Sequence, residues 1–205
     1  MARDTSSIVK QSRREGYALH PKAHKALIKR TSPPGQQGGR FQRGKASQYA
    51  IQLREKQKVK RLYGLLERQF AKLMAEASRS HGQSGAVLLE YLERRLDNVL
   101  YRAGFAPSRR AARQLASHGH FMLNGRRVDV PSIRVKVGDV LNLREHGKQT
   151  DYFKRLDDTS PAPAAVPAWL KVERKKFQIT VGGLPTREDA EPDIKEQLIV
   201  EYYSR

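Results

Sequence analysis

Apolar residues recur at helical spacing along much of the first half of the chain. From Ser47 onward they return every three or four positions, which is the pattern of an amphipathic helix with one buried stripe. The first stripe consists of Val59, Leu62, Tyr63, Leu66, Phe70 and Leu73. A loop at 80–85 separates it from a second stripe, made of Leu88, Leu89, Leu92, Leu96, Val99, Leu100 and Ala103. Gly104 stands where helices commonly end, so the pattern predicts two helical regions before it.

A third, shorter helix is predicted directly afterwards. Ser108 follows Pro107 and can accept a hydrogen bond from an unpaired amide at a helix start. The helix then runs from about Arg109 to His118, and Gly119 ends it. Its buried side is expected to consist of Ala111, Ala112 and Leu115.

Strand patterns follow this helix. Asn124-Gly125 joins 121–123 to 126–128, and this dipeptide is typical of a type I′ hairpin turn. The apolar residues at 133, 135 and 137 alternate with Arg134 and Lys136, which predicts a strand with one buried and one basic face. A turn at Gly138-Asp139 leads into a further strand at 140–143.

The remaining segments have weaker patterns. The first 45 residues are basic and contain the breaker run 32–39, so they are either a loose tail or an extension that becomes ordered against phosphate. A Pro/Ala-rich connector at 157–168 is expected to form neither helix nor strand. A strand pair is predicted at 169–172 and 177–181, and the apolar end 198–203 is expected to dock onto the body.

Charge narrows the choice of partner. The 205 residues include 40 Lys and Arg against 21 Asp and Glu, a net charge of +19. Residues 1–61 have a net charge of +13, residues 62–155 of +8 and residues 156–205 of −2. A surface with this much positive charge favours an anionic partner, either nucleic acid or an anionic membrane. No apolar run approaches the ~20 residues that span a bilayer, and no apolar export segment is present, so we expect no membrane partner.

Catalysis and metal chemistry find little support in the residues. The chain has no cysteine, which excludes disulfides and Cys-ligated zinc and fits a reducing cytoplasm. It has no HExxH pair, no nucleotide-phosphate loop and no serine elbow. We interpret Asp97 as an ion-pair or inter-helix residue, and His118 and His120 as polar contacts at the helix–strand corner. We therefore expect no enzyme activity, no cofactor and no metal.

A binding surface is better supported. Arg109, Arg110 and Arg113 share one side of the short helix with Gln114, because residues three and four apart are neighbours there. Arginine can bind phosphate oxygens through two parallel hydrogen bonds, and a helix N-terminus adds backbone amides. The patch continues along the predicted strands at Arg126, Arg127, Arg134 and Lys136.

Two features define that surface further. Residues 62–155 contain only nine acidic residues against seventeen basic ones. The arginines of the patch are therefore expected to remain open to a ligand rather than to pair with local carboxylates. The cations of 54–61 mostly lie off their apolar stripe and are expected to face phosphate as well. A basic surface spread over two regions suits folded RNA better than a DNA major groove.

The stretch 94–143 carries the motifs RLDNVLYR, SRRAARQL, SHGHF and NGRRVDVPS. It closely resembles the RNA-binding domain named after bacterial small-ribosomal-subunit protein four. Pseudouridine synthases, a group of tyrosyl-tRNA synthetases and a heat-shock RNA-binding protein also carry that domain. Further motifs at Ser12–Gly16, Pro34–Gly38, Gln52–Lys58, Leu66–Phe70 and Leu198–Arg205 extend the resemblance to the ribosomal family over essentially the whole chain.

This resemblance implies an α+β protein in three parts. A basic, irregular N-terminal extension comprises 1–45. A mainly helical basic body comprises 46–93 and 156–205, with C-terminal strands. The RNA-binding lobe comprises 94–155, with two short helices and a small twisted sheet.

The resemblance also implies a structural constituent of the small ribosomal subunit. Such a protein is a primary 16S rRNA binder in the 5′ domain, nucleates assembly of the 30S body and contributes to translational accuracy. Its implied partners are neighbouring small-subunit proteins, especially protein five, and mRNA near the channel by which it enters; its implied location is cytoplasmic and ribosome-bound. The residues expected to bind rRNA are Arg13, Arg14, Gly35, Gln36, Gln37, Arg54, Lys56, Lys58, Lys60, Arg61, Arg68, Arg109, Arg110, Arg113, Gln114, Ser117, His118, His120, Asn124, Arg126 and Arg127.

Two departures from the family pattern stand out. Many relatives have a four-cysteine zinc site in the N-terminal segment, which this chain lacks, as a zinc-independent paralogue would. Gln37 occupies the position of the family histidine. The rival hypotheses are an RNA-modifying enzyme with the same domain and a free RNA chaperone outside the ribosome.

Overall fold

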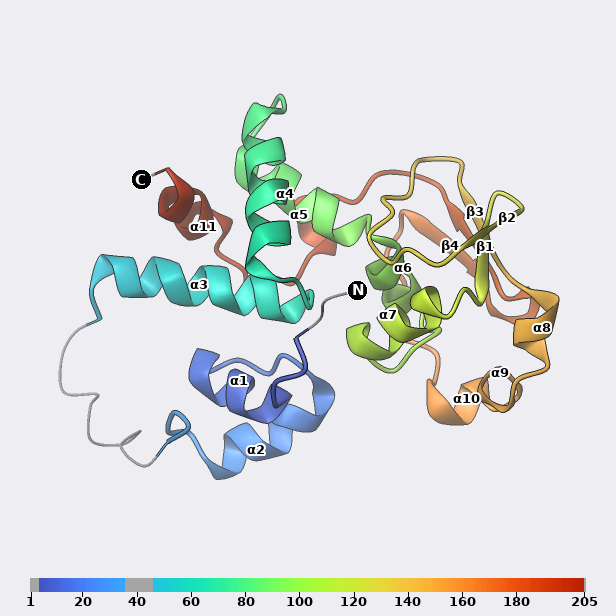
Figure 1. The fold of residues 1–205 in the computed structure, drawn as a ribbon, viewed down its shortest axis with the longest axis horizontal. Helices are drawn as coiled ribbons and strands as arrows, with labels where there is room; N and C mark the ends of the chain where they lie inside the picture. The colour runs from blue at the N-terminus through green and yellow to red at the C-terminus, as the bar shows by residue number, and fades with distance from the viewer. Residues whose placement is uncertain (1–3, 36–45, 205) are drawn as a thin grey trace. The chain divides into compact units, whose positions relative to one another are not determined.

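The computed structural model describes residues 4–35 and 46–204, and the chain divides into two compact units. The first comprises 1–88 and 192–205, and the second comprises 89–191. Figure 1 shows the helices and strands that the two units contain. Each unit has its own architecture.

The first unit is helical. Its elements are α1 (Ile8–Glu15), the 3-10 turn η1 (Pro21–Ala23), α2 (His24–Lys29), α3 (Gln48–Leu62), α4 (Glu67–Arg79), the start of α5 (Ser84–Glu93) and α11 (Glu196–Tyr203). Residues 4–35, for which we predicted irregular backbone, thus contain two helices. A left-handed glycine at position 16, with φ of 63°, ends α1.

The first apolar stripe forms two helices rather than one continuous helical region. Gly64 has a φ of 67°, a left-handed conformation that ends α3. The amide of Leu65 then donates to the carbonyl of Lys60 at 2.9 Å, which closes the helix end. Both halves of the stripe are nevertheless buried, at Val59 on α3 and at Phe70 on α4.

The C-terminal helix docks on α3, as predicted for the apolar end of the chain. The rings of Tyr49 and Tyr202 lie 5.7 Å apart between centroids. The Gln52 amide donates to the carboxylate of Glu201 at 2.7 Å. Figure 1 shows α11 beside α3 in the first unit.

The second unit begins with another interrupted helix. The predicted helix through Ala103 divides into α5 and α6 (Leu96–Arg102). At the break, Arg95 is extended and forms an isolated antiparallel bridge with Arg134. The amide of Leu96 donates to the carbonyl of Ile133 at 2.8 Å. The chain therefore uses backbone groups freed at the helix break to hold the segment around 133.

This pairing also corrects the strand predicted at 133–137. These residues, all of them described, form only the single bridge at Arg134. Val135 is buried, but Val137 is 56% exposed, so the predicted buried face does not extend along the segment. The segment follows the helix break instead of joining the sheet.

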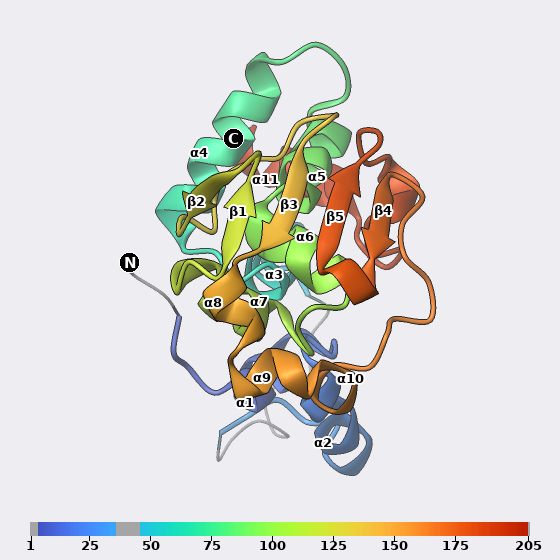
Figure 2. The same cartoon turned by 90° about the vertical axis from the view of Figure 1, so that its right-hand side faces the viewer.

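A five-stranded antiparallel sheet completes the second unit. The strands are β1 (Phe121–Leu123), β2 (Arg126–Val128), β3 (Val140–Leu143), β4 (Leu170–Glu173) and β5 (Gln178–Val181), in the order β2-β1-β3-β5-β4. Figure 2 shows them edge to edge. The register pairs Phe121 with both Val128 and Leu143, and Leu141 with Ile179.

The strand pair β4–β5, which we assigned to the helical body, is therefore part of this sheet. Its apolar residues, such as Ile179 and Val181, are buried in the same core as the helices of the second unit. Short helical turns complete the unit: α8 (Glu145–Lys148), α9 (Asp151–Lys154), α10 (Leu156–Thr159), η2 (Arg174–Lys176) and η3 (Arg187–Asp189). The start of the predicted connector is thus helical, and 160–168 contains neither helix nor strand.

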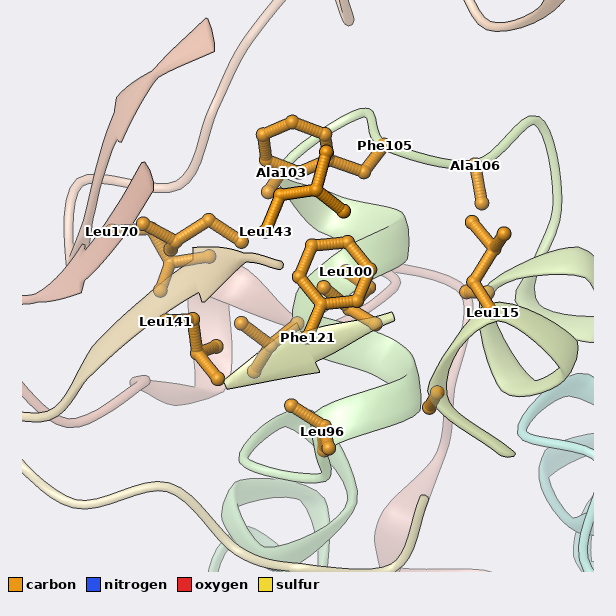
Figure 3. Close-up of a cluster of buried hydrophobic side chains, with 14 of the residues drawn as sticks. Leu96, Leu100, Ala103, Phe105, Ala106, Leu115, Phe121, Leu141, Leu143 and Leu170 are labelled. Carbon is orange, nitrogen blue, oxygen red and sulfur yellow. The ribbon is translucent and has the colours of Figure 1, made fainter. Parts of the chain in front are cut away.

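The core lies between the sheet and α6 and α7 (Arg109–Ser117). Figure 3 shows Leu96 and Leu100 of α6 facing Phe121 on β1, with Leu115 of α7 beside them. Phe105 and Phe121 pack edge to face at 5.9 Å. All of these are buried, so α7 is fixed against the sheet by one face and turns its other face outward.

Candidate nucleic-acid interface

The β1–β2 hairpin presents two arginines at the edge of the sheet. Asn124 and Gly125 have φ of 49° and 80°, the left-handed pair of the predicted type I′ turn. The Asn124 amide donates to Asp139 at 2.8 Å, and its oxygen accepts from the amide of Val140 at 2.9 Å. Asn124 thus ties the turn to the start of β3.

Beyond that turn, Arg126 and Arg127 are exposed on an edge strand. Neither forms an ion pair with a carboxylate among the residues that the structure describes. Charged residues on an edge strand discourage pairing with another strand and remain available to a charged partner. The hairpin therefore holds two cations on a rigid support.

Helix α7 differs from the prediction of an open arginine patch. As predicted, the hydroxyl of Ser108 accepts from the amide of Ala111 at 3.2 Å. Arg109, however, donates to Asn98 at 2.8 Å and to Glu191 at 2.9 Å, and its guanidinium lies 4.6 Å from the centroid of the Tyr101 ring. The side chain of Arg109 is only 12% exposed.

Buried acids bind several arginines of this region, which are therefore engaged inside the protein rather than open to a partner. The Glu93 side chain is fully buried and accepts two hydrogen bonds from Arg102, at 3.0 and 2.9 Å. Asp97 accepts two from Arg95, at 3.0 and 2.7 Å, and lies 3.7 Å from Arg113. The interpretation of Asp97 as an ion-pair residue is thus confirmed. Arg110 and Gln114 are exposed on the outer side of α7, and the Ser117 hydroxyl donates to the carbonyl of Arg113.

A hollow of about 350 Å³ lies beside the end of α7. It is lined by His118, Gly119, His120, Arg144, His146 and Gly147. The pKa of His120 is lowered, chiefly because the ring is partly buried and also because His118, His146 and Arg144 lie nearby. The placement of His118 and His120 at the helix–strand corner is therefore confirmed.

In the first unit, the motif at Ser12–Gly16 has mainly internal contacts. Arg13 donates to the carbonyls of Ser32 and Pro33, which fastens α1 to the breaker run. Glu15 has a fully buried side chain and pairs with both Arg54 and Arg61. Burial raises the pKa of Glu15, and the two arginines oppose that rise. Arg14 is exposed.

A second hollow, of about 370 Å³, lies beside α1 in this unit. It is lined by Ser6, Ser7, Lys10, Gln11, Arg14, Pro34, Gly35 and Arg61. Three of the predicted site residues, Arg14, Gly35 and Arg61, thus come together there. Gln36 and Gln37, the next two predicted residues, lie outside the described part of the chain.

The cations of α3 face acids of this chain rather than open solvent. Lys56 is buried, pairs with Glu67 at 2.8 Å and lies 4.4 Å from the centroid of the Tyr202 ring. Lys60 pairs with the same Glu67 at 3.1 Å, and Lys58 pairs with Glu55 at 2.8 Å. The expected phosphate-facing surface of α3 is therefore largely engaged internally, whereas Arg68 at the start of α4 is exposed.

Three cationic or protonatable residues of the two hollows, Lys10, Arg144 and His146, escaped the sequence prediction. Lys10 lies four residues before Arg14 on α1, and this spacing could have revealed it. Arg144 and His146 are adjacent to His120 only because β3 pairs with β1. No local pattern signals that contact.

Two other site classes find no support. Among the residues that the structure describes, no group of three or more His, Asp or Glu side chains is arranged to hold a metal ion. Within the same residues, none of the helices has the length and apolar character to cross a membrane.

Comparisons with known proteins cover both units. Residues 3–93 match the family described as ribosomal protein S4/S9 N-terminal domain, and residues 94–141 match the S4 domain. The chain is 49% identical to small ribosomal subunit protein uS4 of Herpetosiphon aurantiacus and 50% identical to that of Chloroflexus aurantiacus. It is 48% identical to the protein of the same name in Clostridioides difficile. Each alignment covers the whole of both chains.

Proposed function

Because the chain belongs to the small ribosomal subunit protein uS4 family, we propose that it is a primary binder of 16S rRNA that acts in the 5′ domain. Membership makes it a ribosomal protein with an S4 RNA-binding domain, and its relatives are structural ribosomal proteins rather than enzymes. The proposal adds the early, direct contact with 16S rRNA. It also adds nucleation of the 30S body and a contribution to translational accuracy.

One observation carries the proposal: three acids of the second unit are engaged by arginines of the α5–α7 region, whereas the cations of the β1–β2 hairpin have no acidic partner among the described residues. Glu93, Asp97 and Glu191 all pair with arginines of the α5–α7 region. Arg126 and Arg127 on the hairpin are left exposed and without a carboxylate partner among the described residues. A rigid, positively charged edge suits RNA, which proteins recognise largely through phosphates and shape.

The first unit supplies a second basic surface for the same partner. Lys10, Arg14 and Arg61 converge on the hollow beside α1. None of the described residues that line this hollow carries a carboxylate, although Arg61 pairs with Glu15. Two separate phosphate-binding surfaces favour a large folded RNA over a short single strand.

The finer partners and location are part of the same proposal. We infer contact with neighbouring small-subunit proteins, protein five above all, and a position near the channel through which mRNA enters. We place the protein on ribosomes in the cytoplasm. Family membership supports each of these inferences.

The proposal is tested with the full-length protein and a transcript of the 16S rRNA 5′ domain. Binding should weaken steeply between low and physiological salt, because each phosphate contact releases counterions. In cells, the protein should remain with 30S particles sedimented at high salt. An affinity that does not change with salt, or release of the protein from 30S particles, would contradict the proposal; the second result would favour a free RNA chaperone.

A further inference from the structure

The hollow beside the end of α7 gathers four protonatable or cationic groups from three places in the chain. His118 follows α7, His120 precedes β1, and Arg144 and His146 stand where β3 leads into α8. The rings of His118 and His120 are 5.9 Å apart between centroids. The Arg144 guanidinium donates to the carbonyl of Gly119 at 3.2 Å, which fixes it at the edge of the hollow.

A fifth cation lies against the same glycine. A Cβ placed on Gly119 would stand 2.7 Å from Nε of Arg127 and 3.1 Å from its Nη2. The guanidinium of Arg127 therefore occupies the space of the missing side chain. Gly119 also has a φ of 67°, so both its backbone conformation and the close approach of Arg127 favour glycine. The exposed hairpin and the hollow are thus parts of one surface.

No carboxylate neutralises this cluster among the described residues. The nearest acid on α8, Glu145, pairs with Lys148 at 2.6 Å and its side chain is 84% exposed. On α9, Phe153 packs edge to face on His120 at 5.7 Å, and the charged residues Asp151 and Lys154 are exposed. Positive groups held together without a counterion make a favourable site for an anion and an unfavourable one for a metal cation.

We propose that this hollow is a seat for a backbone phosphate of bound RNA, and that filling it draws a proton onto the imidazole of His120. The inference rests on the proposed RNA-binding function and adds a ligand, a place and a proton linkage. Arg144 and Arg127 supply the permanent charge. His120 supplies charge that depends on whether the phosphate is present, and His118 and His146 line the same hollow.

The direction of the linkage follows from the charges. Without RNA, burial and the neighbouring positive groups lower the pKa of His120 and so favour its neutral ring. A phosphodiester stays negative throughout this range and favours the imidazolium form. RNA binding therefore takes up a proton. The affinity for RNA increases as pH falls from above the pKa that His120 has in the RNA complex to below the pKa that it has in the free protein. Each unit of difference between these two pKa values is worth up to about ten-fold in affinity.

The test compares RNA affinity at about pH 8 and about pH 5.5, at constant ionic strength, for the full-length protein and the 16S rRNA 5′-domain transcript. The triple variant H118Q/H120Q/H146Q removes the three imidazoles. Because His120 packs on Phe153, the double variant H118Q/H146Q, which changes only exposed rings, is measured beside it. The control variant H24Q/H81Q removes two exposed histidines of the first unit.

Wild-type protein and the control should bind roughly ten-fold more tightly at the lower pH than at the higher one. The triple variant should lose most of that difference, and the double variant, which keeps His120, should retain more of it than the triple variant does. Calorimetry near pH 6.5 in two buffers of different ionisation enthalpy should show proton uptake for the wild type and the least uptake for the triple variant.

Equal pH dependence in the wild type and both variants would overturn the inference while leaving salt-dependent RNA binding, and so the proposed function, intact. Absence of RNA binding at any pH would instead refute the proposed function. Added inorganic phosphate should leave the pH dependence in place, because an RNA phosphate is delivered at high effective concentration by its other contacts. If millimolar phosphate abolished the pH dependence, free phosphate would be the occupant of the hollow. That result would contradict the proposal that an RNA phosphate fills it.

Discussion

Helix α3 and the β1–β2 hairpin are both rich in cations, yet the two regions use them differently. On α3, Lys56, Lys58 and Lys60 pair with acids of the same unit, and the acids come from α3 itself and from α4. On the hairpin, Arg126 and Arg127 are exposed and have no acid within reach among the described residues. The number of cations in a segment therefore overestimates an RNA surface wherever acids of the same unit pair with them.

The same contrast exists inside the second unit. Arg102 and Arg109 are held by Glu93 and Glu191, whereas the hairpin arginines are not. The internally paired cations contribute to stability, and the exposed ones are left for a partner. Changing an acid or a cation of each kind should therefore separate effects on folding from effects on binding.

The largest expected effect on folding is that of Glu93→Ala. This change would leave Arg102 without its bidentate partner, and the Asn98 amide would keep only the backbone carbonyl of residue 93 as acceptor, near a fully buried position. We expect the free energy of unfolding to fall by about 3 kcal/mol, as for removal of one member of a buried ion pair. Urea unfolding measures it, with Glu145→Ala as the matched exposed control. Equal losses in both variants would mean that the buried network does not stabilise the unit.

Lys56→Met should have the next largest effect. Lys56 is buried between Glu67 and the Tyr202 ring, and its loss removes the ion pair between α3 and the start of α4 and the cation–π contact between α3 and α11. We expect the free energy of unfolding to fall by about 2 kcal/mol. This is less than for a fully buried ion pair, because Glu67 is partly exposed. RNA affinity at a temperature where the variant is folded should stay within two- to three-fold of the wild type (roughly 0.5 kcal/mol). A large loss of affinity with unchanged stability would make Lys56 an RNA ligand instead.

A smaller effect should appear in acid. Burial tends to raise the pKa of Glu67, but hydrogen bonds from Lys56, Tyr203 and Lys60 outweigh it and lower the pKa below 4.5. A carboxyl group with a lowered folded-state pKa contributes stability above about pH 4.5 and loses it as pH falls through the folded pKa. The Tm of the wild type should therefore decrease between about pH 5 and pH 3 more than that of Glu67→Gln. Parallel pH profiles for the two proteins would exclude this linkage.

Local signals predicted much of this fold. Asn124-Gly125 specified the hairpin, Ser108 and Gly119 bounded α7, and the apolar end of the chain predicted the docking that α11 shows. Each of these features depends on a few consecutive residues whose conformational preferences are strong.

Contacts between residues distant in sequence could not be predicted from local sequence patterns. The break before Leu96 depends on hydrogen bonds to the segment around 133, which no pattern near Leu96 signals. The partner of Arg109, Glu191, lies 82 residues away and outside the region whose acids were counted, so the patch was expected to be more open than it is. The strand pair β4–β5 is recognisable locally, but its place beside β3 is a matter of topology. Burial of Glu15 between two arginines of α3 likewise required the fold.

The RNA-binding role of the exposed arginines is the central claim, and the double variant R126A/R127A tests it most directly. Neither side chain forms an ion pair within the described residues, so Tm should match the wild type to within about 1 °C. The affinity for the 16S rRNA 5′-domain transcript should fall about ten- to a hundred-fold. The slope of log affinity against log salt should become shallower by roughly 1.5 to 2, one released counterion for each lost phosphate contact. An unchanged affinity and an unchanged salt slope in this correctly folded variant would contradict the account.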